Sequence, residues 1–296
     1  MKICRCNICG NEGKFIQEDV KREGILCANC SASSRLRAVI YVLGICLGYG
    51  DLPLIAWSKS KTIRILESSG RSSYPMILRE KFEYYNTEYN PESELTKKPF
   101  TRFADFQSLA YADDQFDCVL ASDVFEHIRD DENAFSEVFR VLKPNGVFIL
   151  TVPYEHEWAE TLVRVKAEGA KDVFLLPPEY HGGGGQTLAY RKYGRDLLDR
   201  LRRRGFSVGY LDLEVPKYNI DRQPLFICMK SSYIDLSRFL IQEKDDISQK
   251  ALKASPLILF RIFVTIKYNL FSVKHFASEV VRKLSDTFRN RPKAGN

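Results

Sequence analysis

The chain has 296 residues, 45% of them hydrophobic, so it is long enough to bury one large core with accessory segments. The formal net charge of +6 comes from residues 231–296, which contain 12 Lys and Arg against 6 Asp and Glu, while the remainder is balanced at 32 against 32. That balance counts against a catalytic region built to contact nucleic-acid phosphates. The polar, Cys-rich start predicts no signal peptide. We therefore expect a cytoplasmic protein whose eight cysteines serve as metal ligands or core residues, not as disulfides.

Two pairs of cysteines lie close to the N-terminus. Cys6 and Cys9 form the first C-x-x-C pair, and Cys27 and Cys30 form the second after 17 intervening residues. This spacing is typical of a four-thiolate zinc site, in which each tight turn presents two sulfur atoms. We predict a zinc-binding module over residues 1–32, with a structural Zn²⁺ that has no open position for a substrate. The alternative is four free thiols in a small module.

A helix is predicted over residues 31–49, within a linking segment that spans residues 33–60. Its apolar residues recur at helical spacing, and a serine can cap its start. Arg35 and Arg37 lie in its first turn. They can bind an anionic group of a substrate or pair with carboxylates of the next domain. The second interpretation is favoured, because charged residues on a helix usually form a solvated face or local ion pairs.

Strands and helices alternate from residue 61 to residue 230. Apolar runs predict strands over residues 62–68, 82–89, 100–106, 116–121, 147–152, 207–214 and 225–229. Helices are expected after Asp130, which can cap the first of them, and over residues 193–204. Two buried strands joined by a helix imply a right-handed parallel crossover. The pattern predicts an α/β fold that is Rossmann-like, with a seven-stranded, mostly parallel sheet.

The stretch from Phe116 to Pro153 reads FDCVLASDVFEHIRDDENAFSEVFRVLKPNGVFILTVP. It resembles the fourth and fifth strands of class I S-adenosylmethionine (SAM) methyltransferases of the methyltransferase type 11-like group. In that family FD-x-V, a polar strand end, EH and LKPGG recur in this order. The arrangement C-x-x-C-x-x-x-x-R-x-R is similar to zinc-bearing methyltransferase-like proteins. The resemblance implies a methyltransferase domain over residues 61–230 that uses SAM.

The resemblance assigns three cofactor-binding residues to the turn after the first predicted strand, namely Glu67, Ser69 and Gly70. In the family, an acidic residue and a glycine-rich turn occupy this place, because glycine lets the backbone approach a ligand closely. In this chain the turn has a single glycine, Gly70, and small serine residues such as Ser69 stand beside it. Glu67 is expected near the methionine part of SAM or near a backbone amide that it orders.

Four further cofactor-binding residues follow later strands. Glu88 ends the second predicted strand about 20 residues past the first motif, where a carboxylate can accept both ribose hydroxyls. The resemblance implies that Asp105 accepts the adenine amino group and that Ser122 faces the methionine part. Phe106 can stack on the adenine ring.

Asp123, His127 and His181 are the candidate catalytic residues. Asp123 and His127 follow the fourth predicted strand at the carboxyl edge of the sheet, where open α/β sheets bind ligands. Methyl transfer chiefly requires alignment, and a hydroxyl or amine acceptor also requires a base. His127 is a candidate base because its ordinary pKa lies near neutrality. It can instead cap the following helix.

Residues 154–190 form a long segment between the fifth strand and the next helix. His181 stands beside four glycines, and Tyr154, Trp158 and Tyr180 can form an aromatic floor for an acceptor. Long loops in compact domains are usually functional or disordered, so a flexible connector is the other interpretation.

A basic tail occupies residues 231–296, and residues 257–271 within it are strongly apolar. Two charges interrupt that run, so we do not expect it to cross a membrane. The tail is predicted to form amphipathic helices that pack on the domain or on a second copy. Peripheral contact with the inner face of a membrane is the next alternative, and nucleic acid is unlikely on charge grounds.

These features predict a SAM-dependent methyltransferase that acts on an O or N atom of a small-molecule or glycan-type acceptor. One alternative is an RNA methyltransferase, because ribosomal-RNA guanine methyltransferases also join a zinc module to this fold. The other is a zinc-bearing binding protein whose methyltransferase domain has lost catalysis, an interpretation that the glycine-poor first motif supports.

Overall fold

The computed structural model describes residues 4–17, 23–72, 74–89, 100–181 and 187–234. The chain divides into two compact units, Met1–Phe239 and Leu240–Asn296, and all described residues belong to the first. Residues 235–296, and with them the predicted amphipathic helices of the tail, lie outside the described residues. Within the part that is described, no helix is both long and apolar enough to cross a membrane.

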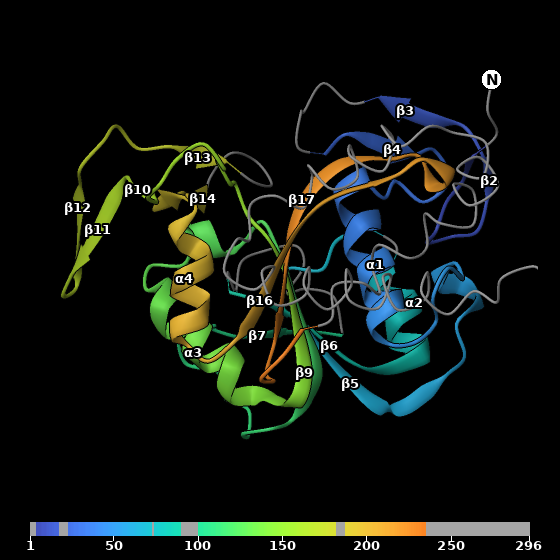
Figure 1. Cartoon of the computed structure of the whole chain (residues 1–296), viewed down its shortest axis with the longest axis horizontal. Helices are drawn as coiled ribbons and strands as arrows, with labels where there is room; N and C mark the ends of the chain where they lie inside the picture. Colours follow the sequence, from blue (N-terminus) through green and yellow to red (C-terminus); the bar gives the residue numbers. More distant parts are fainter. Residues whose placement is uncertain (1–3, 18–22, 73, 90–99, 182–186, 235–296) are drawn as a thin grey trace, which may run out of the picture. The chain divides into compact units, whose positions relative to one another are not determined.

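A mixed, mostly parallel sheet forms the centre of the first unit, in the order β16-β17-β9-β8-β5-β6-β7 (Figure 1). Its strands are β5 (Ser60–Ser68), β6 (Phe82–Glu88), β7 (Thr101–Phe103), β8 (Phe116–Ser122), β9 (Leu142–Thr151), β16 (Ser207–Val215) and β17 (Ile220–Met229). The neighbours from β7 to β9 are parallel, and β17 runs antiparallel to β9 and β16. The predicted Rossmann-like fold is confirmed.

The chain order places a switch point at the middle of this sheet. From β5 the chain moves outward through β6 and β7, then returns to β8 on the other side of β5. The connections on either side of β5 therefore diverge at the carboxyl ends of β5 and β8. In open α/β sheets this crevice is where ligands bind.

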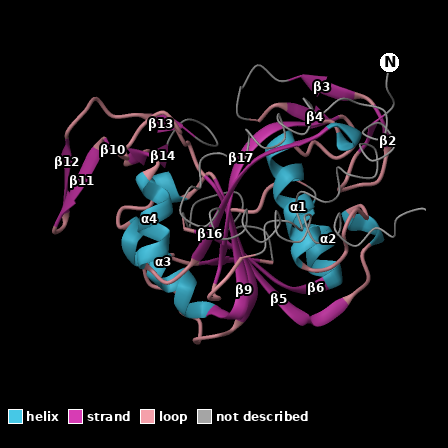
Figure 2. Ribbon diagram, in the orientation of Figure 1, coloured by secondary structure: helices cyan, strands magenta, loops and turns pink. Residues whose placement is uncertain are grey.

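Helices cover both faces of the sheet (Figure 2). They are α1 (Ser34–Cys46) and α2 (Tyr74–Lys81) on one face, and α3 (Asp131–Val141) and α4 (Asp196–Arg203) on the other. Successive strand residues alternate between the two cores: Ile65 packs on the α1 side, whereas Leu66 packs on the α3 side. Because both faces are buried there, the central strands β8 and β9 each contain a continuous apolar run.

α3 begins as predicted from the sequence, after Asp130. The Asp130 side chain accepts a hydrogen bond from the Asn133 amide at 3.0 Å and so caps the helix. At its end, α3 is followed directly by β9, and the register of β9 is irregular over Lys143 to Gly146, where Asn145 has a φ of 64°. β7 is also shorter than the predicted strand.

The N-terminal module consists of short antiparallel pairs, β1 (Cys4–Arg5) with β2 (Glu12–Gly13), and β3 (Phe15–Gln17) with β4 (Ile25–Cys27). It shares a core with α1 and the sheet, into which Ile8 is fully buried. Arg37 fastens the module to the domain: it donates to the Ala32 carbonyl at 3.0 Å and to the Asn219 carbonyl at 2.8 Å. Asn219 directly follows the short 3₁₀ helix η3 (Pro216–Tyr218), which joins β16 to β17.

The segment predicted as a long loop contains antiparallel strand pairs where it is described. These are β10 (Leu162–Val163) with β15 (Arg191–Lys192), β11 (Val165–Glu168) with β12 (Lys171–Phe174), and β13 (Tyr180–His181) with β14 (Thr187–Leu188). The four glycines that follow His181 lie outside the described residues. Two more 3₁₀ helices, η1 (Leu54–Ala56) and η2 (Phe125–His127), follow α1 and β8.

Candidate active site and cysteine cluster

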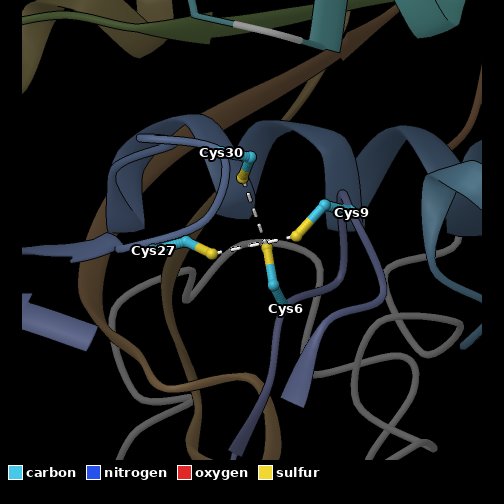
Figure 3. Close-up of side chains that lie close together, drawn as sticks. All are labelled: Cys6, Cys9, Cys27 and Cys30. Atoms are coloured by element: carbon cyan, nitrogen blue, oxygen red, sulfur yellow. Dashed lines mark hydrogen bonds between the residues drawn. The ribbon is translucent and has the colours of Figure 1, made fainter. Parts of the chain in front are cut away.

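The four predicted zinc ligands converge on one point (Figure 3). Their sulfur atoms all lie within 4.8 Å of one another. The Sγ atoms of Cys6 and Cys30 are 3.8 Å apart, as are those of Cys9 and Cys27. A tetrahedral ion with Zn–S bonds of about 2.3 Å places its sulfurs about 3.8 Å apart. The separations therefore match a zinc tetrathiolate and are far too long for disulfides.

The two C-x-x-C turns have the same backbone geometry. The Gly10 amide donates to the Cys6 carbonyl at 2.9 Å, and the Ser31 amide donates to the Cys27 carbonyl at 2.8 Å. Gly10 and Ser31 both adopt positive φ, 73° and 56°. Each turn thereby directs backbone amides at its own first sulfur, as shown by the Ile8 amide 3.4 Å from Cys6 Sγ. Such amides partly compensate thiolate charge.

A buried cation stands beside this cluster. Arg37 is fully buried and interacts electrostatically with Cys6, Cys27 and Cys30. Burial lowers the pKa of Arg37, and the neighbouring sulfurs oppose that shift. Four thiolates around a divalent ion carry a net charge of about −2, which a nearby guanidinium offsets. The donor set, spacing and surroundings all fit a structural zinc ion.

The first cofactor turn rests on a buried carboxylate. Glu67, at 1% exposure, accepts hydrogen bonds from the phenols of Tyr74 and Tyr84. Burial raises the pKa of Glu67 to about 7, although the two phenols partly stabilise its charged form. Both phenols keep their protons near neutral pH, since burial raises their own pKa values.

This carboxylate should make stability depend on pH. In the unfolded chain Glu67 should ionise near pH 4.3, whereas in the folded chain it ionises near 7. The folded state therefore binds more protons in this window, and stability falls as pH rises through it. Between pH 5.5 and 8 we expect Glu67→Gln, which is neutral throughout, to gain about 2 kcal/mol of stability relative to the natural chain. Urea unfolding of both proteins at pH 5.5 and at pH 8 measures this gain. An equal change in unfolding free energy between the two pH values for both proteins would refute it.

Ser69 and Gly70 lie against the end of β6. Ser69 adopts a φ of 57°, in the left-handed region that favours glycine, and donates from Oγ to the Glu88 carboxylate at 3.0 Å. The Gly70 amide donates to Asn86 Oδ1 at 2.9 Å. The structure thus brings together three predicted cofactor residues, Ser69, Gly70 and Glu88, at the switch point.

The predicted ribose and adenine ligands lie at the ends of β6 and after β7. Glu88 is 8% exposed and also accepts from the Tyr89 amide at 3.0 Å. Asp105 accepts from the backbone and side-chain nitrogens of Gln107 at 2.9 and 3.1 Å, which fixes its carboxylate. Phe106 is 4% exposed and packs edge-on against Phe125, so most of its ring is committed to the core.

Ser122 and Asp123 form a polar network with a residue from the linking helix. Ser122 Oγ accepts from Arg35 at 2.6 Å and lies 3.0 Å from Thr151 Oγ1, which also donates to Asp123 at 3.1 Å. Arg35 is 3.5 Å from the Asp123 carboxylate and also pairs with Glu23. Burial opposes its charge, but Asp123 and Glu23 outweigh that effect and raise the pKa of Arg35. The favoured interpretation of Arg35, pairing with domain carboxylates, is confirmed.

The two candidate catalytic histidines meet, although they are 54 positions apart. The rings of His127 and His181 have centroids 4.6 Å apart in an edge-on arrangement. His127 Nδ1 lies 2.9 Å from the Leu188 carbonyl oxygen, so it carries the proton and Nε2 keeps its lone pair. Burial lowers the pKa of His127, which favours the neutral ring. Glu126, fully buried, lies 3.8 Å from its Nε2.

The aromatic residues of the acceptor-side segment have separate surroundings. Tyr154 packs on Tyr210 and Phe226 with ring centroids 5.3 and 5.0 Å away. Trp158 lies under Lys192, and Tyr180 is 51% exposed on β13. The aromatic floor stays a prediction.

Three residues of this region were not assigned a site role from the sequence alone: Thr151, Tyr74 and Glu126. Thr151 is the last residue of β9. Its place at the carboxyl edge of the sheet could have indicated a site role, because that strand was predicted from the sequence. Glu126 directly precedes His127 and was visible in the EH pair. Tyr74 belongs to α2, for which the sequence offered no clear periodicity.

Comparison with known proteins agrees with this geometry. Residues 67–150 match the family model for a methyltransferase domain. The sterol 24-C-methyltransferase erg6 of Aspergillus fumigatus is 36% identical over 75 residues, which are 25% of this chain and 19% of that protein. The chain therefore matches about a fifth of this relative's length.

Solved structures were compared as well. An S-adenosylmethionine-dependent methyltransferase from Mesorhizobium loti is 16% identical with a TM-score of 0.40, covering 67% of this chain and 97% of its own. A SAM-dependent methyltransferase from Methanosarcina mazei is 17% identical with a TM-score of 0.39, covering 60% and 97%. Similarity at this level does not indicate which acceptor this chain methylates. Over residues 67–150 the chain is thus similar to the methyltransferase-domain family, and a Cys4 cluster precedes that matched stretch.

Proposed function

We propose that this chain catalyses methyl transfer from SAM to an O or N atom of a small-molecule or glycan-type acceptor. One observation carries the proposal: the Ser69–Gly70 turn, Glu88, and the Ser122–Asp123 pair share the carboxyl edge of the sheet at its switch point. That edge is where this architecture binds nucleotides. Zn²⁺ is proposed as a structural ion held by the four cysteines.

The cofactor roles follow from position and from hydrogen-bonding capacity. Glu88 would accept the ribose hydroxyls, and Asp105, held by Gln107, would accept the adenine amino group. The backbone at Ser69 and Gly70 would approach the methionine part, above the buried Glu67. Ser122 would face the same part from β8. Phe106 would contribute a ring edge more readily than a stacking face, given its burial.

The reaction needs little from the protein beyond alignment and water exclusion. The sulfonium of SAM already activates the methyl group, and an in-line approach of the acceptor atom lowers the barrier by orientation. Asp123, His127 and His181 lie beyond the proposed methionine subsite, on the acceptor side. A hydroxyl or amine acceptor would lose its proton there.

Charge supports the acceptor class. Lys and Arg match Asp and Glu outside residues 231–296, at 32 each, so the catalytic unit has no excess of cations for a nucleic-acid backbone. The excess in residues 231–296 supports peripheral contact of the tail with an anionic membrane surface. We therefore propose a cytoplasmic protein whose tail packs on the domain or on a second copy, with peripheral contact at the inner face of a membrane as the alternative.

The acceptor can be tested with methyl-labelled SAM. Zinc-loaded protein is incubated with a metabolite and glycan extract or with total RNA, and the label is followed through solvent and nuclease fractionation. Label in the metabolite or glycan fraction, lost in Glu88→Ala,Asp105→Ala, supports the proposal. Label in the nuclease-sensitive fraction would move the assignment to RNA. SAM binding without transfer to either pool would favour the non-catalytic alternative.

A further inference from the structure

Glu126, His127 and His181 form a second cluster with metal-ligand geometry. Each offers one ligand atom, and the three atoms lie within 4.8 Å of one another. Within this group the Glu126 carboxylate is 3.8 Å from His127 Nε2. Two imidazoles and one carboxylate on one side of an ion are the ligand set of divalent first-row metals with open positions. The cluster adjoins Asp123 and lies apart from the cysteine cluster in sequence.

A second layer of hydrogen bonds fixes the ligands. His127 Nδ1 is held by the Leu188 carbonyl at 2.9 Å, which directs Nε2 toward the cluster. Metal-binding histidines typically have such a carbonyl partner on the other ring nitrogen. The Tyr190 amide donates to the Glu126 carbonyl at 2.8 Å. These contacts attach η2 to β14 and to Tyr190, two residues after it.

The hairpin itself delivers the third ligand. His181 pairs with Thr187, and the neighbouring pair is Tyr180 with Leu188, the residue whose carbonyl holds His127. Arg191 completes the attachment by donating to the Ile128 carbonyl at 2.5 Å and the Arg129 carbonyl at 2.9 Å. The pairing of β13 with β14 therefore sets where His181 lies relative to His127.

The buried carboxylate of Glu126 also favours a cation in this cluster. Glu126 is fully buried, and a buried carboxylate is costly unless a positive charge lies close to it. Arg35 is one such charge, because it interacts electrostatically with Glu126. A divalent ion between the carboxylate and the two imidazoles would add a second positive charge beside Glu126.

We propose that Glu126, His127 and His181 bind a divalent transition-metal ion, which in turn binds the oxygen of a hydroxyl acceptor. This inference rests on the proposed methyltransferase function for its role, but not for the binding site. Adjacent ligands of an octahedral ion with bonds of about 2.1 Å lie about 3 Å apart. The cluster therefore contracts on binding, chiefly through His181, which is half-buried on its hairpin.

The ion would narrow the acceptor to a hydroxyl-bearing molecule. Coordination lowers the pKa of a bound hydroxyl, so its proton leaves to water near neutral pH. The oxygen then forms the new bond to the methyl carbon. The carbon–sulfur bond breaks, and its electron pair returns to sulfur as the positive charge is lost. His127 and His181 act here as ligands and not as bases.

Cobalt binding to the zinc-loaded full chain tests this inference. Co²⁺ binds imidazole and carboxylate ligands, and its visible absorption reports coordination. Charge transfer from thiolates would reveal exchange into the cysteine cluster, and zinc content is measured in parallel. We expect one additional Co²⁺ per chain, and an affinity reduced at least about tenfold in His181→Ala. The matched control is His156→Ala, an exposed histidine beside Glu157 that lies outside the cluster.

The outcomes separate this inference from the proposed function. Equal Co²⁺ affinity in His181→Ala and the natural chain, or no cobalt bound beyond the cysteine site, would overturn it. Circular dichroism and zinc content verify that both variants are folded. SAM titration of the same samples is independent: cobalt binding without SAM binding would retain the metal site and reject the enzyme, and the reverse would retain the enzyme alone.

Discussion

Replacing Cys27 with serine should abolish stoichiometric zinc and lower the midpoint of thermal unfolding by about 10 °C or more. Binding to four thiolates contributes roughly 10–16 kcal/mol of apparent free energy in small zinc modules, because the site forms only on folding. Cys27 is 3% exposed and joins the core shared by the module, α1 and the sheet. Loss of the ion would therefore weaken the first unit beyond the module itself.

The effect should reach the candidate active site. Arg35 is the second residue of α1, five positions after Cys30, and its guanidinium contacts Ser122 and Asp123. Arg37 joins the same region to the turn between β16 and β17. Once the module opens, neither arginine is held in place. We expect SAM affinity to fall together with zinc content.

Cys46→Ser is the matched control, because Cys46 is another cysteine packed against the same core but stands outside the cluster. It should keep one zinc per chain and lose at most a few degrees of thermal stability. Zinc is measured by elemental analysis, and unfolding by calorimetry. A Cys27→Ser protein that retains full zinc and an unchanged midpoint would show that the four sulfurs do not form the site.

Gly70→Ala should weaken SAM binding by about 5- to 150-fold, equivalent to about 1–3 kcal/mol of overpacking. A Cβ at this position would stand 2.6 Å from Asn86 Oδ1, 2.6 Å from the Tyr84 hydroxyl and 2.9 Å from a Glu67 carboxylate oxygen. Such separations are shorter than normal contacts, and all three atoms belong to a buried hydrogen-bonded group. The turn must move away from them, and the proposed cofactor subsite moves with it.

The comparison for this variant is Gly13→Ala. Gly13 lies on exposed β2, and a Cβ there meets only the Asn11 side-chain nitrogen at 3.6 Å. It should bind SAM as the natural chain does. Calorimetric titration measures both affinities. Unchanged SAM affinity in a folded Gly70→Ala protein would show that the turn does not contact the cofactor.

The parts of this structure that sequence predicts well are those set by local pattern. The strand from Phe116 is apolar from Cys118 to Ala121 because both faces of the sheet are covered, and Asp130 caps α3 through a hydrogen bond three residues away. The C-x-x-C pairs predict a cluster because chemistry demands their spacing. Each of these features is specified by residues that are close together in the sequence or by a pattern that recurs along it.

Long-range pairing defeats this kind of prediction. Arg35 meets Asp123, and His127 meets His181, through contacts that no local periodicity specifies. β13 and β14 have only two residues each, and β14 is held by a contact with His127 of η2. Strands this short leave no periodic pattern, so the surrounding sequence resembles a loop. Phe106 illustrates a different difficulty. Its position matches a family pattern for an adenine contact, while its burial is decided by packing on Phe125.

The central claim is tested most directly by calorimetric titration of the zinc-loaded protein with SAM and with its demethylated product. The double variant Glu88→Ala,Asp105→Ala is titrated alongside. We expect micromolar binding of both ligands by the natural chain and loss of that binding in the double variant, because the ribose and adenine partners are removed. Absence of binding by the folded, zinc-loaded natural chain would contradict a SAM-dependent enzyme.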